Sequence, residues 1–389
     1  MKLKVLVTFG TRPEAIKLAP LIRILKSFDQ QLITKVCITA QHREMLDQVL
    51  DIFEITPDFD LNIMKPGQDL YDITANVLQG MKSVLNDFEP DIVIVHGDTT
   101  TTFAASLAAF YKKIRVAHIE AGLRTGNIYS PWPEEMNRVL VSRIASFNFA
   151  PTEESANNLI SEKVDKGTIF VTGNTVIDAL FWVVDLIERN QGIRDKLIEE
   201  INETIADQNF NVLDSRFILV TAHRRENFGD NFLNICNALK DIALKNTEIH
   251  IIYPVHLNPS VQEPVNKILS GIPNVHLIKP MSYLPFVYMM NKSHIIITDS
   301  GGIQEEAPSL GKPVLVIRNT TERQEAVDAG VVRLVGTDRN NIVSSTQELI
   351  DSNEAYSQMA SIQNPYGDGK ACEKIVEQLI NQTKIRYIQ

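Results

Sequence analysis

Two acidic residues, Asp98 and Glu120, each follow a short apolar run that predicts a buried strand. These runs cover residues 91–95 and 114–119. Ligands of open parallel sheets bind beyond the carboxyl ends of the strands, so a carboxylate at either place is a candidate general acid or base. For Asp98 the alternative is capping of the helix that is expected to begin near Thr99.

A second pair of acids, Glu134 and Glu135, lies directly after Pro133 in the first turn of a helix predicted over residues 133–145. Carboxylates are common in this turn because they complement the positive end of the helix dipole. The position alone therefore leaves both a structural and a chemical role open for this pair.

Basic residues follow the first predicted strand, residues 4–9. Arg12 and Lys17 lie beyond the glycine at position 10, on a helix expected to continue to about residue 28. They could form a solvated helix face. Their place at a strand end instead favours contact with an anionic ligand.

The second half of the chain offers mostly cations and backbone amides at its strand ends. The apolar run at residues 295–298 stops at Asp-Ser-Gly-Gly, and a helical pattern begins at Ile303. A strand that feeds such a turn points unpaired N–H groups outward and suits a phosphate group. Further strand-end candidates of the second half are His223, His256, Ser300, Gly301, Gly302, Glu306 and Arg323.

Glu305 and Glu306 follow this glycine turn closely. One interpretation is that both complement the helix dipole. The other is that one of them accepts hydrogen bonds from two ribose hydroxyls and leaves the amides for a diphosphate.

Strands and helices alternate throughout, which predicts an α/β fold built from doubly wound, Rossmann-like parallel sheets. The alternation pauses over a charged stretch at about residues 188–214 and then resumes, so the chain is expected to form two domains. The first has carboxylates at its strand ends and the second has cations and amides. We expect the two to form a cleft, in which the second holds an anionic tail and the first acts on a neutral group.

Composition excludes several classes of function. The 389 residues are 44% hydrophobic and 22% charged, which is typical of a globular protein, and the net charge of −10 argues against general nucleic-acid binding. No apolar run approaches the roughly 20 residues of a membrane span, and the start is expected to be a first strand. The three cysteines are widely spaced, which predicts no disulfide framework and fits a reducing cytoplasm.

Common cofactor and nucleophile motifs are absent from the sequence. There is no Gly-x-Gly-x-x-Gly after the first strand, no Walker motif, no Gly-x-Ser-x-Gly, no His-Glu-x-x-His and no paired Cys-x-x-Cys. We therefore expect neither a cofactor nor a catalytic metal.

Seven motifs, spread over most of the chain, resemble those of the non-hydrolysing UDP-N-acetylglucosamine 2-epimerases. They are GTRPEAIK at 10–17, HGDTTTT at 96–102, HIEAGLRT at 118–125, PEEMNR at 133–138, TAHRREN at 221–227, PVHLNP at 254–259 and TDSGGIQEEAP at 298–308.

The resemblance implies a fold of the glycosyltransferase-B type. Its first domain would cover residues 1–173, joined by a C-terminal helix at 367–389 that crosses back, and its second domain would cover residues 174–366. It also implies a homodimer and a role in supplying N-acetylmannosamine for cell-surface polysaccharides.

The implied reaction is reversible inversion at C2, through loss and return of UDP. By motif, Asp98, Glu120 and Glu134 would be the acid and base candidates, and Glu306 would hold the ribose. His223 would also be catalytic and, with Arg12, would stabilise the departing diphosphate. The remaining implied contacts to the substrate are Lys17, Phe286, Ser300, Gly301, Gly302 and Arg323. A second, activating substrate molecule would contact Gln41, His42, Gln68 and His256.

One motif departs from the family pattern. TERQEA at 321–326 has Gln324 where members commonly have proline, which is expected to loosen the loop that carries Arg323. Three other functions share the fold or the substrate: a hydrolysing 2-epimerase, a glycosyltransferase and a non-catalytic nucleotide-sugar sensor. The complete Pro13–Lys17 continuation disfavours the first, and the carboxylates at strand ends disfavour the third.

Overall fold

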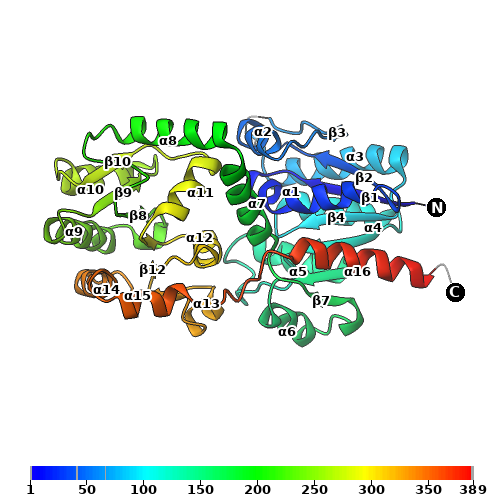
Figure 1. Cartoon of the computed structure of the whole chain (residues 1–389). Helices are drawn as coiled ribbons and strands as arrows, with labels where there is room; N and C mark the ends of the chain where they lie inside the picture. Colours follow the sequence, from blue (N-terminus) through cyan, green and yellow to red (C-terminus); the bar gives the residue numbers. More distant parts are fainter. Residues whose placement is uncertain (1, 41–42, 66, 387–389) are drawn as a thin grey trace. The chain divides into compact units, whose positions relative to one another are not determined.

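A computed structural model of the protein describes residues 2–40, 43–65 and 67–386 (Figure 1). The chain divides into two compact units. Unit 1 comprises Met1–Ala179 and Tyr366–Gln389, and unit 2 comprises Leu180–Pro365.

Unit 1 contains a parallel seven-stranded sheet in the order β3-β2-β1-β4-β5-β6-β7. Its central strand β4 is buried over its whole length and apolar except for His96, as in sheets that are covered on both faces. The strands are β1 Leu3–Phe9, β2 Leu32–Ile38, β3 Phe59–Asp60, β4 Ile92–His96, β5 Arg115–Ile119, β6 Phe147–Ala150 and β7 Ile169–Val171.

Helices cover both faces of this sheet, in keeping with a doubly wound fold (Figure 1). They are α1 Arg12–Ser27, α2 Arg43–Ile52, α3 Leu70–Phe88, α4 Thr100–Tyr111, α5 Glu134–Ile144, α6 Glu153–Ser161, α7 Thr175–Arg189, which continues into unit 2, and α16 Ala371–Arg386.

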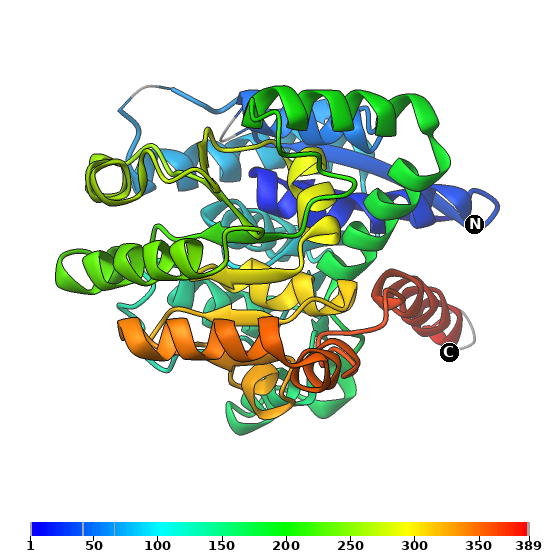
Figure 2. The same cartoon turned by 60° about the vertical axis from the view of Figure 1, so that its left-hand side comes forward.

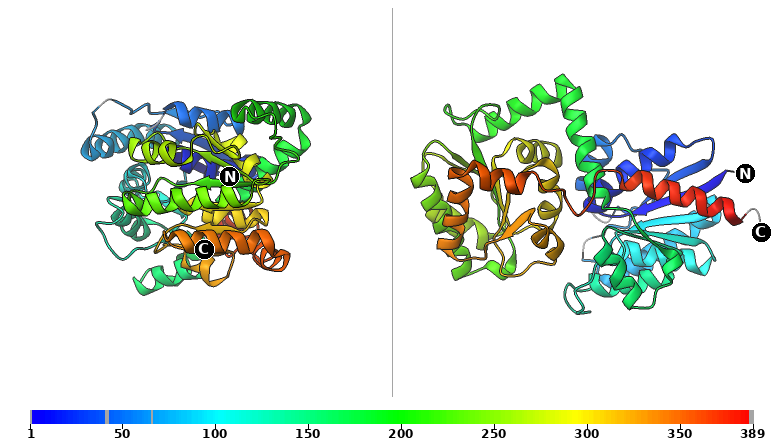
Figure 3. Two further views of the ribbon diagram at one scale, coloured as in Figure 1. Left: turned by 90° about the vertical axis from the view of Figure 1, so that its left-hand side faces the viewer. Right: turned by 60° about the horizontal axis from the view of Figure 1, so that its bottom comes forward.

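The C-terminal helix α16 is part of unit 1, where it packs against α1 (Figure 3, right). Its first turn is held by Asp178, whose carboxylate accepts hydrogen bonds from the N–H groups of Ala371 and Cys372 at 3.2 and 2.8 Å. The residue before α7 adds a backbone bond, since the Asn174 N–H donates to the Tyr366 carbonyl at 2.7 Å. The start of α16 is thereby fixed to the start of α7.

Unit 2 contains a parallel six-stranded sheet in the order β10-β9-β8-β11-β12-β13. Two of its flanking helices, α9 and α14, lie side by side (Figure 2). The strands are β8 Phe217–Thr221, β9 His250–Pro254, β10 Val275–Ile278, β11 Ile295–Thr298, β12 Val314–Val316 and β13 Val332–Leu334. The helices are α8 Gln191–Ile205, α9 Asp230–Lys245, α10 Pro259–Leu269, α11 Tyr283–Lys292, α12 Gly301–Glu306, α13 Gln324–Asp328, α14 Arg339–Asp351 and α15 Asn353–Ala360.

In each sheet, the order in which successive strands are added reverses between two adjacent strands. In unit 1 the order runs outward from β1 and β4, and in unit 2 from β8 and β11. Such a switch point leaves a crevice beyond the carboxyl ends of the two strands, where open α/β sheets bind ligands. The predicted α/β class with two doubly wound parallel sheets is confirmed. None of the helices in the described part of the chain is long and apolar enough to span a membrane.

Candidate active site

At the switch point of unit 1, a buried carboxylate joins the loops after β1 and β4. Glu14 Oε2 accepts hydrogen bonds from the N–H groups of Gly10 and Thr11 at 3.0 and 2.8 Å. Its Oε1 accepts from the hydroxyls of Thr99 and Thr102 at 2.7 and 3.1 Å. Burial raises the pKa of Glu14, and these hydrogen bonds oppose the rise. Glu14 thus fixes the two loops that carry the predicted residues Arg12 and Asp98.

The loop after β1 also requires a glycine. A Cβ atom on Gly10 would lie 2.2 Å from the Thr39 hydroxyl and 2.5 Å from the Thr101 hydroxyl. Only glycine lets the backbone pass these side chains before α1 begins at Arg12.

Glu120 is the most enclosed of the predicted acid and base residues whose exposure is measured. It follows β5 in the left-handed region, with φ of 63°, and its side chain is 9% exposed. Lys17 Nζ forms an ion pair with Glu120 Oε2, and Asn174 Nδ2 donates to the same oxygen at 3.0 Å. His96 Nε2 lies 3.9 Å from it. The predicted pair Lys17 and Glu120 therefore meet in one polar cluster.

Two buried histidines complete this cluster, and sequence reasoning did not single them out. Burial lowers the pKa of His96 to about 3 and that of His118 to about 4, so both rings are neutral at neutral pH. His118 Nε2 lies 2.7 Å from the Gly97 carbonyl, which fixes the proton on that nitrogen. Their only signal in the sequence is that they begin the motifs containing Asp98 and Glu120.

Asp98 is not the cap of α4. The N-cap is Thr99, whose hydroxyl accepts from the Thr102 N–H at 3.1 Å. Asp98 Oδ2 instead pairs with Arg138 Nη2, and the Asp98 carbonyl accepts from Asn137 Nδ2 at 2.9 Å. Helix α5 therefore supplies the partners of Asp98, although sequence reasoning did not select Arg138.

The structure also separates Glu134 from Glu135. Glu135 is 1% exposed, and its Oε1 accepts from the N–H groups of Thr125 and Gly126 at 3.0 Å each. Its Oε2 lies 3.1 Å from Arg138 Nη1. Glu134 is only partly buried, and within the described residues no side-chain hydrogen bond or ion pair involves it. Glu135 is thus structural, and Glu134 is the member of the pair left to contact a ligand.

At the switch point of unit 2, Asp299 organises the loop after β8. It is fully buried, and its Oδ2 accepts from the N–H groups of His223 and Arg224 at 2.8 Å each and from Asn227 Nδ2 at 3.3 Å. Its Oδ1 lies 3.4 Å from His223 Nδ1. Sequence reasoning missed this residue, although it directly precedes the Ser-Gly-Gly turn.

The His223 ring is partly exposed, with Asp299 on one side and a second imidazole against it. Burial lowers the pKa of His223, and the Asp299 carboxylate partly offsets this change. The His256 ring stacks on it with a centroid distance of 5.3 Å and an interplanar angle of 11°. Although His256 was predicted to serve a second ligand site, the structure places it beside His223.

The turn after β11 is packed tightly against the loop after β12. Ser300 is the N-cap of α12 by position, without a side-chain capping bond. A Cβ on Gly301 would lie 3.2 Å from Glu322 Oε1 and 3.4 Å from the Arg323 guanidinium carbon, whereas Gly302 is exposed. The amides of this turn and the Arg323 side chain are therefore near neighbours.

Glu305 and Glu306 have different partners. Glu305 is 1% exposed and accepts from Arg323 Nε at 2.7 Å, with Arg323 Nη2 also at 2.7 Å. Glu306 Oε1 accepts from the Tyr283 hydroxyl at 3.2 Å. Arg323 is thus held by a buried acid despite the glutamine at position 324. Phe286 lies three residues after Tyr283 on α11, on the same side of that helix.

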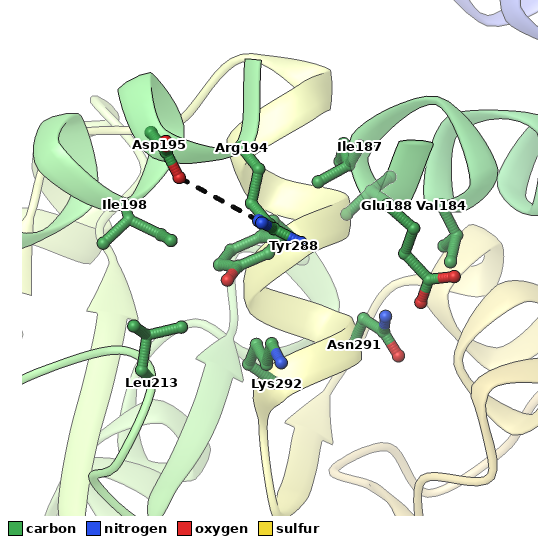
Figure 4. Close-up of a pocket in the computed structure, with 11 residues that line it drawn as sticks. Val184, Ile187, Glu188, Arg194, Asp195, Ile198, Leu213, Tyr288, Asn291 and Lys292 are labelled. Carbon is green, nitrogen blue, oxygen red and sulfur yellow. Dashed lines mark ion pairs between the residues drawn. The ribbon is translucent and has the colours of Figure 1, made fainter. Parts of the chain in front are cut away.

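A cavity of ≈580 Å³ in unit 2 lies elsewhere (Figure 4). Residues of α7, α8 and α11 line it, together with Leu213. Its polar groups include Arg194 and Asp195, whose nearest side-chain atoms are 4.0 Å apart, and Lys292, whose Nζ lies 5.7 Å from the Tyr288 ring centroid. It is formed by helix faces, whereas the predicted residues gather at strand ends.

The residues predicted for a second ligand site are only partly described. Gln41 and His42 lie outside the described residues. Gln68 Oε1 accepts from the Lys65 N–H at 2.8 Å, just before α3.

The chain is similar to proteins of one family along nearly its whole length. A family model described as UDP-N-acetylglucosamine 2-epimerase matches residues 26–380. UDP-N-acetylglucosamine 2-epimerase of Campylobacter jejuni is 58% identical over 378 residues, which cover 97% of each chain. The protein of that name from Escherichia coli K12 is 58% identical over 97% of this chain and 99% of its own length.

Solved structures of UDP-GlcNAc 2-epimerases are also similar to this chain along nearly its whole length. The crystal structure of UDP-GlcNAc 2-epimerase from Neisseria meningitidis, bound to UDP-GlcNAc, superimposes with a TM-score of 0.87 at 56% identity, covering 97% of this chain and 100% of that one. The Methanocaldococcus jannaschii UDP-GlcNAc 2-epimerase, in complex with UDP-GlcNAc and UDP, gives 0.76 at 33% identity, with 97% and 99% covered.

Proposed function

Because the chain belongs to the UDP-N-acetylglucosamine 2-epimerase family, we propose that it interconverts UDP-N-acetylglucosamine and UDP-N-acetylmannosamine without net hydrolysis. The observation that carries this proposal is the enclosed Glu120 carboxylate, held by Lys17 and Asn174 after β5, the strand next to the switch-point strand β4. A base in such a place can move a proton on a bound sugar.

The substrate dictates an indirect route. The C2 proton of the sugar is not adjacent to a carbonyl group, so its direct removal is very unfavourable. In an elimination, a base takes the C2 proton, the C1–C2 double bond forms, and the C1–O bond breaks with its electron pair leaving on UDP. The products are a 2-acetamidoglucal and UDP. Protonation at C2 from the opposite face and return of UDP to C1 then give the epimer.

Unit 1 supplies the groups for the proton transfers. We assign Glu120 or Asp98 to the C2 proton on one face and Glu134 to the other face. In support, Glu120 and Asp98 each have a cationic partner that orients the carboxylate, namely Lys17 and Arg138. Glu134 differs from its neighbour Glu135 because its carboxylate is not used by the loop at Thr125.

Unit 2 supplies the groups for the leaving diphosphate. His223 and the amides of Ser300, Gly301 and Gly302 stabilise the negative charge that develops as the C1–O bond breaks. Asp299 positions His223 by holding its N–H and facing its ring. Arg323 of unit 2, together with Arg12 of unit 1, would add positive charge beside the diphosphate.

The nucleoside end of the substrate is assigned to α11 and α12. We propose that Glu306 accepts hydrogen bonds from the ribose hydroxyls and that Phe286 flanks the uracil. The Tyr283 hydroxyl, 3.2 Å from Glu306 Oε1, orients the carboxylate for this contact.

We further propose a homodimer that supplies N-acetylmannosamine for cell-surface polysaccharides. The exposed apolar side chains of unit 1 support the dimer. Tyr71 of α3, 85% exposed, Phe110 and Tyr111 of α4, and Leu140 of α5 project from helices that pack against one another. Contiguous exposed apolar patches mark protein interfaces, so we take these neighbouring helices as the candidate dimer surface. A second, activating substrate would contact the region of Gln41, His42 and Gln68.

Proton NMR in heavy water tests the reaction. The protein is incubated with UDP-N-acetylglucosamine, and the C2 signals of both epimers are followed. We expect UDP-N-acetylmannosamine to form with deuterium at C2 in both epimers and no lasting release of UDP. Net accumulation of free sugar and UDP would instead establish a hydrolysing enzyme. Absence of exchange would refute epimerisation.

A further inference from the structure

Three potential metal ligands meet at the amino-terminal edge of the unit 2 sheet. His250 Nδ1 lies 2.9 Å from His276 Nε2, which in turn lies 3.6 Å from Asp207 Oδ2. All three atoms are within 4.8 Å of one another. In a tetrahedral zinc site with bonds near 2.0–2.1 Å, neighbouring donor atoms are roughly 3.3 Å apart. The His250–His276 distance of 2.9 Å is slightly below this value, and the His276–Asp207 distance of 3.6 Å is slightly above it.

The two histidines are held by adjacent strands. His276 of β10 pairs with Ile252 of β9, and His250 precedes Ile252 by two residues. Because side chains alternate between faces along a strand, His250 and His276 point to the same face. Their separation is thus set by the sheet, which positions ligands more rigidly than loops do.

The third ligand is oriented by its own loop. Asp207 lies between α8 and β8, and its Oδ1 accepts from the Asn209 N–H at 2.9 Å. This bond directs Oδ2 toward His276, as outer hydrogen bonds do in metal sites. Phe210 covers the group, with its ring centroid 5.3 Å from that of His250 and 5.8 Å from that of His276. Among the described residues, no lysine or arginine forms an ion pair with Asp207.

The chemistry of these atoms favours a cation. Two neutral imidazole nitrogens 2.9 Å apart can share only one proton, so at least one of them presents a lone pair. Asp207 Oδ2 lies close to these two nitrogens, 3.6 Å from His276 Nε2. A divalent ion would take both imidazoles and the carboxylate as ligands, and the shared proton would move to the other nitrogen of its own ring, so that both rings stay neutral.

We propose that Asp207, His250 and His276 bind a divalent transition-metal ion of the zinc type, with water completing its coordination. Two imidazoles and one carboxylate form a borderline donor set that suits Zn²⁺, Co²⁺ and Ni²⁺ better than Mg²⁺ or Ca²⁺. The side chains of Asp207 and His276 are 21% and 7% exposed, which leaves an entry path on the Asp207 side.

The proposed ion would stabilise the fold of unit 2 and would take no part in the reaction. His250 begins β9, whereas the His223–His256 pair follows the opposite ends of β8 and β9. Four residue steps of strand separate His250 from Pro254, which is roughly 13 Å. Metal binding would fasten the loop between α8 and β8 to β9 and β10, and would leave the 2-epimerase chemistry unchanged.

The test uses the untagged full-length protein. The protein is stripped of metal, and Zn²⁺ is titrated in by calorimetry. His250→Gln and His276→Gln each remove one ligand, and Asp207→Asn removes the charge on a loop while keeping an oxygen for the Asn209 N–H. His294→Gln is the matched control, because His294 is a unit 2 histidine that stacks on Tyr356 and is not one of the three ligands. Circular dichroism checks the fold of every variant.

We expect one Zn²⁺ per chain in the wild type and in His294→Gln, and at least tenfold weaker binding in the three cluster variants. Co²⁺ should give visible d–d bands without a sulfur charge-transfer band, since the three cysteines are buried and outside the cluster. Absence of Zn²⁺ binding to the wild type would overturn the proposal. Equal affinity in folded cluster variants, or a sulfur-ligated Co²⁺ spectrum, would also overturn it.

Discussion

The two units have the same sheet topology at their switch points but present different chemistry there. In unit 1 the strand ends carry acids, each fixed by a cation from a helix, as Lys17 fixes Glu120 and Arg138 fixes Asp98. In unit 2 the acid that follows β11, Asp299, is fully buried and instead fixes the loop that carries the partly exposed His223. The loops therefore decide whether a switch point exposes a proton acceptor or an anion-binding surface.

This comparison predicts that variants of the two units have opposite phenotypes. Glu120→Gln should give the largest effect and lower the rate of C2 hydrogen exchange by roughly 10³-fold, because general-base catalysis is lost. Calorimetry should show unchanged UDP binding. Exchange at the wild-type rate would remove Glu120 from the mechanism and leave Asp98 as the candidate for that face.

Asp299→Asn should weaken UDP binding and leave unit 1 intact. A hydrogen bond to a charged group contributes about 1.5–3 kcal/mol, which corresponds to roughly a 10- to 100-fold loss of affinity. Because the Asp299 charge raises the pKa of His223, its removal should lower that pKa further and shift the pH profile of kcat/KM. An unchanged pH profile with an unchanged UDP affinity would contradict the positioning role.

Tyr283→Phe should have a smaller effect, confined to nucleoside binding. Loss of one hydrogen bond to Glu306 costs about 0.5–1.5 kcal/mol. We expect KM to rise roughly three- to tenfold at constant kcat. A fall in kcat at constant KM would show that Glu306 acts in the chemical step and not in substrate binding.

The smallest expected effect concerns the pH dependence of stability, to which the buried histidines of unit 1 contribute. His118 has a lowered folded-state pKa of about 4, so on acidification the unfolded chain binds the proton and stability falls. Between pH 7 and pH 6 the wild type should lose about 0.7 kcal/mol more than His118→Gln, in which an amide can still donate to Gly97. Urea unfolding at both pH values measures the difference, and equal losses would show that His118 is not buried as a neutral ring.

The sequence was sufficient for the fold class and for several strands, because buried parallel strands are continuous apolar runs. Strand β11 has the predicted bounds, and the ends of β1, β4 and β5 lie within one residue of the predicted ones. The two-residue strand β3 carries too little pattern to be found. The family assigned from the motifs is also confirmed.

The partners of the site residues could not be predicted in the same way. Sequence placed Asp98 and Glu120 at strand ends, but Arg138 and Asn174 reach them from elements 40 and 54 residues away. Glu134 and Glu135 are equivalent in sequence and differ only because the loop at Thr125 folds over one of them. Asp207, His250 and His276 come from three separate elements, so their spacing resembles no metal motif.

The central claim is that the C1–O bond breaks and UDP stays bound until it returns. Positional isotope exchange tests it most directly, with UDP-N-acetylglucosamine that carries ¹⁸O in the bridge between C1 and the β-phosphate. We predict that the label moves into the non-bridging oxygens of the β-phosphate during epimerisation, because the freed phosphate can rotate before it re-adds. Epimerisation at C2 with the label held in the bridge would contradict the account.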